Sequence, residues 1–146
     1  MRPLPVVRPF LKKERQEKIM AKTICKLLGV LFILVGLIGF AKSDLLGAHL
    51  TTAHNLVHLI SGAVALYFGF AASLSAARAF CLVFGAVYLL LGVVGFIMGT
   101  GDDRMLNVIP NQLMLGTADH AIHILLGVIF LVGALMTKDG RARVTD

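Results

Sequence analysis

The sequence predicts an all-α membrane protein with four transmembrane helices, built from two parallel helical-hairpin repeats. Three observations lead to this fold class: a strongly apolar composition, four long apolar runs, and a sequence that matches itself at two fixed shifts. Of the 146 residues, 58% are hydrophobic and only 15% are charged, and the mean hydropathy is +0.86. This apolar share exceeds that of a typical soluble domain and therefore indicates a bilayer environment.

Four apolar runs are long enough, or nearly so, to cross a hydrocarbon core at the helical rise of about 1.5 Å per residue. They are residues 24–41, 54–73, 77–99 and 118–136. The segments between them are too short for a second domain, and the longest contains its own Gly, Asp, Pro and Asn breakers. We therefore expect one transmembrane domain over residues 22–137, preceded by a basic segment (1–21) and followed by a cytoplasmic tail (138–146).

The positive charges are sorted by side of the predicted membrane. Twelve of the 14 Lys and Arg residues lie before or at the start of the first run, at the second connection or after the fourth run, and only Lys42 and Arg104 lie on the other side. This distribution follows the positive-inside rule and places both termini in the cytoplasm. The net charge of +6 is thus explained by topology and attraction to anionic lipid, and we expect no nucleic-acid partner.

The basic N-terminal segment raises two questions of processing. Residues 1–21 carry three prolines and mixed charges, so we expect them to be disordered. Met20, followed by "AKTICKLLGVLF", is a more natural start, and residues 1–19 are expected to be an over-extended gene start. The first run also resembles a signal peptide, but its counterpart in the repeat described next has no sign of cleavage, so we expect it to be retained.

The chain matches itself in two places. Shifted by 56 positions, "ICKLLGVLFILVGLIGF" (24–40) lies over "FCLVFGAVYLLLGVVGF" (80–96) with six identities. Shifted by 65, "AHNLVHLISGAVAL" (53–66) lies over "ADHAIHILLGVIFL" (118–131), and His58 matches His123. Because each repeat contains two spans, both copies have the same orientation, related by an axis along the membrane normal.

Small residues and histidines share one face of the second and fourth runs. At about 100° per residue, His54, His58 and Gly62 lie in one stripe, and His123 and Gly127 repeat it. Since small residues mark helix contacts in lipid, this face should turn inward, with a Gly/Ala seam at the bundle centre. The glycines predicted to pack between helices are Gly29, Gly36, Gly62, Gly69, Gly85, Gly92, Gly95 and Gly127.

All five histidines and several acids are expected at the extracytoplasmic end of the bundle. One interpretation is ligation: a transition metal held by His54, His58, His120, His123 and Asp119, or a haem or chlorophyll-type ring held by His58 and His123. A second is structural: polar side chains satisfy free N–H groups at helix starts and bond across the repeat interface. A third is proton or quinone chemistry by neutral imidazole. Cys25 and Cys81, at the cytoplasmic ends, are expected to be packing residues without a disulfide.

Four spans, with "HNLVHLISG" opening the second, "GAVYLLLGVVGF" in the third and "ADHAIHILLG" opening the fourth, resemble the bacterial domain-of-unknown-function family 4383 over about residues 22–136. The resemblance implies a small multi-pass protein of the bacterial inner membrane and implies no activity or catalytic residue. We therefore expect a non-enzymatic accessory or interaction subunit whose partner is another membrane protein or a second copy. The alternative is a metal-, haem- or pigment-binding protein. A transporter is a third candidate, although four helices leave little room for a transport pathway unless the protein oligomerises.

Overall fold

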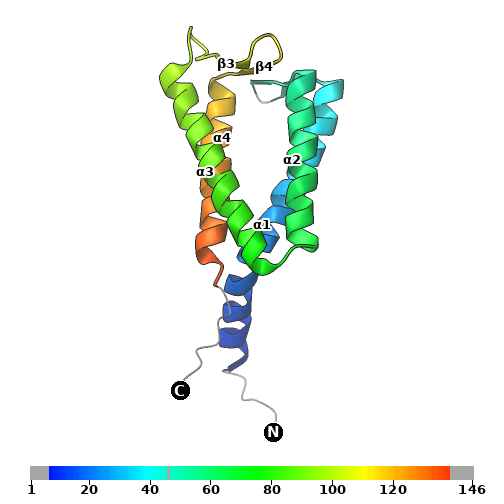
Figure 1. Cartoon of the computed structure of the whole chain (residues 1–146), viewed down its shortest axis with the longest axis vertical. Coiled ribbons are helices and arrows are strands. Elements are labelled where there is room, and N and C mark those ends of the chain that lie inside the picture. The colour runs from blue at the N-terminus through cyan, green and yellow to red at the C-terminus, as the bar shows by residue number, and fades with distance from the viewer. Residues whose placement is uncertain (1–6, 46, 139–146) are drawn as a thin grey trace.

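The computed structural model of the protein describes residues 7–45 and 47–138, with side chains from residue 19 onward. Its helices are α1 (Val7–Ala41), α2 (Thr52–Phe70), α3 (Leu74–Met98) and α4 (Thr117–Met136). Figure 1 shows α1 beside α2 and α3 beside α4, so that two antiparallel hairpins lie close together at one end and diverge toward the other.

The prediction of four helices of membrane-spanning length is confirmed. Within the described residues, the segment Ile19–Ala41 of α1 and the whole of α2, α3 and α4 are long and apolar enough to cross a membrane. The start of α1 and the end of α4 lie at the same end of the bundle (Figure 1). Side-chain caps fix two of the starts, because Thr51 accepts the His54 N–H and Ser73 accepts the Ala76 N–H, each at 3.2 Å.

The helix α1 begins much earlier than the sequence analysis predicted. The expectation of disorder over residues 1–21 is wrong for residues 7–21, which are helical; residues 1–6 lie outside the described part of the chain. The physical reason is local: this segment is rich in Lys, Glu, Gln and Met, which favour helix. Its last proline, Pro9, falls in the first turn, where a backbone N–H has no intrahelical partner to lose.

Two short β-hairpins cover the end where the helical hairpins diverge, and the sequence analysis did not predict them. Strand β1 (Asp44–Leu45) pairs with β2 (Ala48–His49), and β3 (Leu106–Ile109) pairs with β4 (Leu113–Leu115), both antiparallel. The turns are permitted by Gly47 and Asn111, which have positive φ angles of 83° and 60°. Strands of two to four residues are too short to show an alternating pattern, which explains why periodicity missed them.

The glycines line the contacts within each helical hairpin, not the centre of the bundle as predicted. A Cβ built on Gly29 would lie 2.8 Å from Leu66 Cγ across the α1–α2 contact, and one on Gly85 would lie 2.8 Å from Leu131 Cγ across α3–α4. The same close approach occurs at the other six predicted glycines, Gly36, Gly62, Gly69, Gly92, Gly95 and Gly127. The helices of each hairpin therefore pack backbone to backbone.

Aromatic and small side chains fill the space between the two hairpins. Phe32 of α1 and Tyr88 of α3 stack with ring centroids 5.6 Å apart, and Phe130 of α4 contacts both rings. At the end where the two hairpins lie close together, Cys25 and Cys81 are fully buried and form no disulfide, with their sulfurs 3.4 Å apart. This geometry agrees with the prediction of packing cysteines that form no disulfide.

Candidate functional site

Four of the five predicted ligand residues line one cavity at the diverging end of the bundle. His54 and His58 of α2, together with Asp119 and His123 of α4, border a space of about 270 Å³. The rest of the described lining is apolar and comes from α1, α4, the first β-hairpin and the residue that follows it: Leu28, Leu31, Phe32, Val35, Leu45, Ala48, Leu50, Ile122, Leu125, Leu126 and Ile129. A mostly apolar lining with a few polar side chains is the composition typical of ligand sites.

The fifth predicted residue, His120, lies outside this cavity. Its ring is fully buried between α3 and α4, where it contacts Phe96 edge-on with centroids 5.4 Å apart. Its Nε2 donates to the Arg104 carbonyl at 2.7 Å. The prediction that His120 converges with the other histidines on one ligand is therefore wrong, because its ring is turned toward α3.

Asn55 occupies the corresponding position of the first hairpin, 65 residues before His120. Asn55 is 1% exposed, its Nδ2 donates to the Leu50 carbonyl at 3.5 Å, and its Oδ1 has no hydrogen-bond partner. That oxygen lies against Gly39 of α1, just as His120 Nδ1 lies against Gly95 of α3. The glycines make room for two buried polar side chains, each with one orphaned acceptor atom.

A continuous series of rings connects the histidines of the two hairpins. His54 stacks on His58 at 4.6 Å between centroids, and His58 contacts Phe32 at 5.7 Å. On the other side Tyr88 stacks on His123 at 5.2 Å. Since Phe32 and Tyr88 stack on each other, every ring touches the next from α2 to α4. The sequence did contain a signal for this series, because Phe32 matches Tyr88 at the 56-residue shift.

Backbone carbonyls determine which ring nitrogen carries a hydrogen in two of the cavity histidines. The Nδ1 of His54 lies 3.3 Å from the His49 carbonyl, and the Nδ1 of His123 hydrogen-bonds the Asp119 carbonyl. A carbonyl only accepts, so each Nδ1 carries a hydrogen, and in the neutral form of each ring Nε2 is the acceptor. Within the described residues neither Nε2 has a hydrogen-bond partner, so both are free to accept from a ligand.

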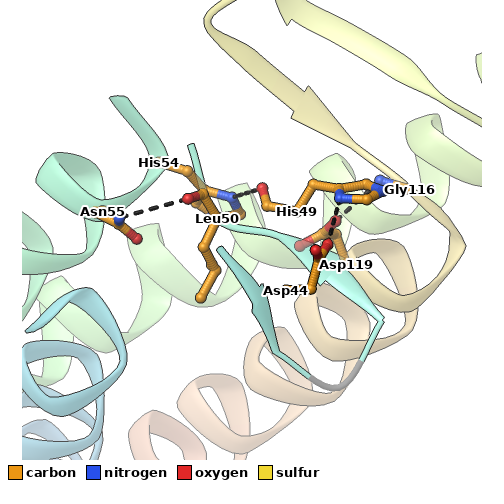
Figure 2. Close-up of polar contacts among 7 residues, drawn as sticks. All are labelled: Asp44, His49, Leu50, His54, Asn55, Gly116 and Asp119. Carbon is orange, nitrogen blue, oxygen red and sulfur yellow. Dashed lines mark hydrogen bonds and ion pairs between the residues drawn. The ribbon is translucent and has the colours of Figure 1, made fainter. Parts of the chain in front are cut away.

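Asp119 is a buried carboxylate whose protein partners use only part of its capacity. The residue is 3% exposed, and its Oδ2 accepts the Gly116 N–H at 2.9 Å at the start of α4 (Figure 2). This hydrogen bond and the helix N-terminus stabilise the negative charge. The second carboxylate oxygen makes no hydrogen bond among the described residues, and no Lys or Arg is among those that line the cavity.

His49 and His58 differ from these groups. The His49 ring is exposed and its Nδ1 lies 2.7 Å from the Asp44 carboxylate across the first β-hairpin (Figure 2). Its contribution to the site is the backbone carbonyl that contacts His54 Nδ1. His58 has a buried Nδ1 with no hydrogen-bond partner and lies within electrostatic range of His54 and His123. In the described part of the chain, no three His, Cys, Asp or Glu side chains are grouped closely enough to hold a metal ion.

Comparison with known proteins gives a family and no activity. The model of a family described as a domain of unknown function (DUF4383) matches residues 22–136, which include α2, α3, α4, most of the membrane-length segment of α1 and all the residues that line the cavity. No curated protein and no solved structure matches the chain.

Proposed function

This chain belongs to the family described as a domain of unknown function (DUF4383), and we propose that it is a non-enzymatic membrane protein that binds a small ligand between its two helical hairpins. One observation carries the proposal: an apolar cavity of about 270 Å³ is lined by His54, His58, His123 and Asp119, and within the described residues each of these side chains has a polar atom without a hydrogen-bond partner. Buried polar groups are normally hydrogen-bonded, so unused ones that share a cavity point to a ligand.

The proposal places the cavity at the extracytoplasmic side of a bacterial inner membrane. The positive-inside distribution of Lys and Arg puts the start of α1 and the end of α4 in the cytoplasm. The β-hairpins and the cavity lie at the opposite end of the bundle (Figure 1). A ligand would therefore enter from the outer leaflet or the aqueous space outside it.

We also propose that the two hairpins arose by duplication, because their contacts match pair by pair. The contact between Gly36 and Asn55 in the first hairpin corresponds to that between Gly92 and His120 in the second, at the same 56- and 65-residue shifts that align the sequences. A pseudo-twofold axis between the hairpins would bring His58 and His123 to equal depths on either side of the Phe32–Tyr88 stack.

The non-enzymatic assignment rests on the chemistry of the cavity lining. Apart from three imidazoles and one carboxylate, the described lining is apolar, and it contains no Ser, Thr, Cys or Lys that an adjacent base could activate as a nucleophile. Such a lining suits a protein that presents or senses a ligand. An accessory subunit that works with another membrane protein, or with a second copy of itself, fits this role.

Ligation of a metal or a haem-like ring is the second candidate, and one observation favours it. A histidine that donates Nδ1–H to a carbonyl and keeps Nε2 free has the arrangement usual for metal ligands, and His54 and His123 both have it. An absorption spectrum and elemental analysis of protein from its native membrane test this candidate. A Soret-type band or stoichiometric metal that is lost in His123→Ala would favour ligation over the leading proposal.

The leading proposal is tested by filling the cavity. Ala48 lines the cavity and is 5% exposed, so Ala48→Phe would place a ring in the ligand space. The matched control is Ala63→Phe, on an exposed position of α2. We expect mass spectrometry of molecules retained by the purified protein to show a species present with the wild type and Ala63→Phe and absent with Ala48→Phe. An identical set of retained molecules in all three proteins would contradict the proposal.

A further inference from the structure

We propose that the cavity between the hairpins selects a primary ammonium group carried on a small apolar body. This inference rests on the proposed function and adds the chemical class of the ligand. It follows from the hydrogen-bonding character of the polar groups, from their charge, and from the size of the apolar part of the cavity.

Three free polar atoms of the cavity lining are acceptors. They are His54 Nε2, His123 Nε2 and the second carboxylate oxygen of Asp119. The Nδ1–H groups of both rings already donate to backbone carbonyls. A primary ammonium has three N–H donors and no acceptor. A primary ammonium can therefore donate to all three acceptors. His58 also lines the cavity and carries at least one N–H, so a carboxylate or a ketone would find a single donor there and three acceptors that it could not satisfy.

Charge favours a cation over a neutral donor. Asp119 is 3% exposed, and the described lining contains no Lys or Arg that would pair with it. A buried carboxylate without a cationic partner is costly, and its attraction for an opposite charge grows as the surroundings become less polar. An ammonium would supply the missing partner and form a charge-assisted hydrogen bond, which is stronger than the bond from a neutral hydroxyl.

The apolar part of the cavity limits the body that carries the ammonium. Phe32, Leu28 and Leu126 are each less than 8% exposed and border the cavity beside the histidines. An apolar protein cavity of about 150 Å³ accommodates a benzene ring, and this one measures about 270 Å³. A single aryl ring or a short alkyl chain fits this volume, and the aromatic lining attracts a nearby cation.

The test compares benzylammonium, benzyl alcohol and benzoate, which share a phenyl body and differ in charge and donors. Binding is measured by calorimetry at neutral pH on the full chain in nanodiscs of zwitterionic phosphatidylcholine, so that lipid charge does not attract the cation. We expect benzylammonium to bind at least about tenfold more tightly than benzyl alcohol and benzoate not to bind. We expect Ala48→Phe to abolish binding of the cation.

Asp119→Asn isolates the charge, because the amide oxygen still accepts the Gly116 N–H and preserves the helix start. We expect this variant to bind benzylammonium and benzyl alcohol within about twofold of each other, while Asp44→Asn, on the exposed β1 carboxylate, keeps the wild-type preference. A second measurement needs no mutation: N,N,N-trimethylbenzylammonium keeps the charge but has no N–H donor, so it should bind the wild type at least about tenfold more weakly.

The outcomes separate the two proposals. If benzyl alcohol or benzoate binds as tightly as benzylammonium, or if the trimethylated cation does, the ammonium class is overturned and small-ligand binding stands. If none of the four compounds binds and no retained molecule depends on the cavity, both proposals are overturned.

Discussion

The two helical hairpins use glycine in the same way but set different polar side chains against it. In the first hairpin Gly39 faces Asn55, and in the second Gly95 faces His120. At the neighbouring matched position the first hairpin has His54 and the second has Asp119, and both line the cavity. The packing positions of the hairpins agree while the polar positions at the diverging end differ. This difference is what we expect if one hairpin was duplicated, if both copies kept the packing residues, and if the polar residues at the diverging end then changed to form a single asymmetric site.

The sharpest way to break this comparison is to add a methyl group at the two matched glycines. A Cβ at Gly95 would overlap the His120 ring, which is fully buried and held by Arg104 and Phe96. A Cβ at Gly39 would overlap the Asn55 amide, which is smaller and held by one long hydrogen bond of 3.5 Å. We expect Gly95→Ala to reduce the free energy of unfolding by about 3 kcal/mol and Gly39→Ala by about 1.5 kcal/mol.

Equilibrium unfolding in bicelles measures both variants, and a double variant supplies the control. Gly95→Ala combined with His120→Ala removes the overlapping ring, so its loss of stability should be smaller than the sum of the two single losses. Equal destabilisation by Gly95→Ala and Gly39→Ala would show that the two contacts are equivalent in rigidity. Strict additivity in the double variant would show that the Gly95–His120 contact does not limit packing.

The helix starts beside the cavity offer a second comparison. Thr51 accepts the His54 N–H and donates its hydroxyl to the Gln112 carbonyl, so Thr51→Ala loses a cap and a tie to the second β-hairpin. Asp119→Ala loses the bond from the Gly116 N–H but also removes a buried carboxylate without a cationic partner. Because these two effects oppose each other, we expect losses of about 1.5 kcal/mol for Thr51→Ala and about 0.5 kcal/mol for Asp119→Ala.

Thermal unfolding monitored by circular dichroism tests the helix-start prediction, with Asp119→Asn as the isosteric control. A larger loss for Asp119→Ala than for Thr51→Ala would indicate that the carboxylate is compensated in the free protein. That result would also remove the electrostatic reason for a cationic ligand.

The sequence allowed much of the scaffold and part of the site to be predicted. The four helices follow from apolar length alone, while the equal depths of His58 and His123 stay a prediction from the repeat. The direction of His120 could not be predicted, because it lies only about 60° around the helix from His123. A single helix face cannot reveal which neighbouring helix meets each of its edges. The aromatic centre was missed for a related reason: small-residue spacing predicts a close contact but does not say which pair of helices makes it.

The smallest expected difference concerns the two matched cysteines where the hairpins meet. Cys81 Sγ lies 3.7 Å from the Ala21 carbonyl as well as 3.4 Å from Cys25 Sγ, whereas among the described residues Cys25 Sγ has a hydrogen-bond contact with Cys81 Sγ alone. A hydroxyl at position 81 therefore has a carbonyl to donate to, and a hydroxyl at position 25 faces a weak sulfur acceptor. We expect Cys25→Ser to cost about 1 kcal/mol and Cys81→Ser about half as much, measured by the same unfolding assay with Cys25→Ala and Cys81→Ala as size controls. If Cys81→Ser is the more destabilising, the Ala21 carbonyl does not serve as an acceptor, and the two cysteines differ in some other feature of their surroundings.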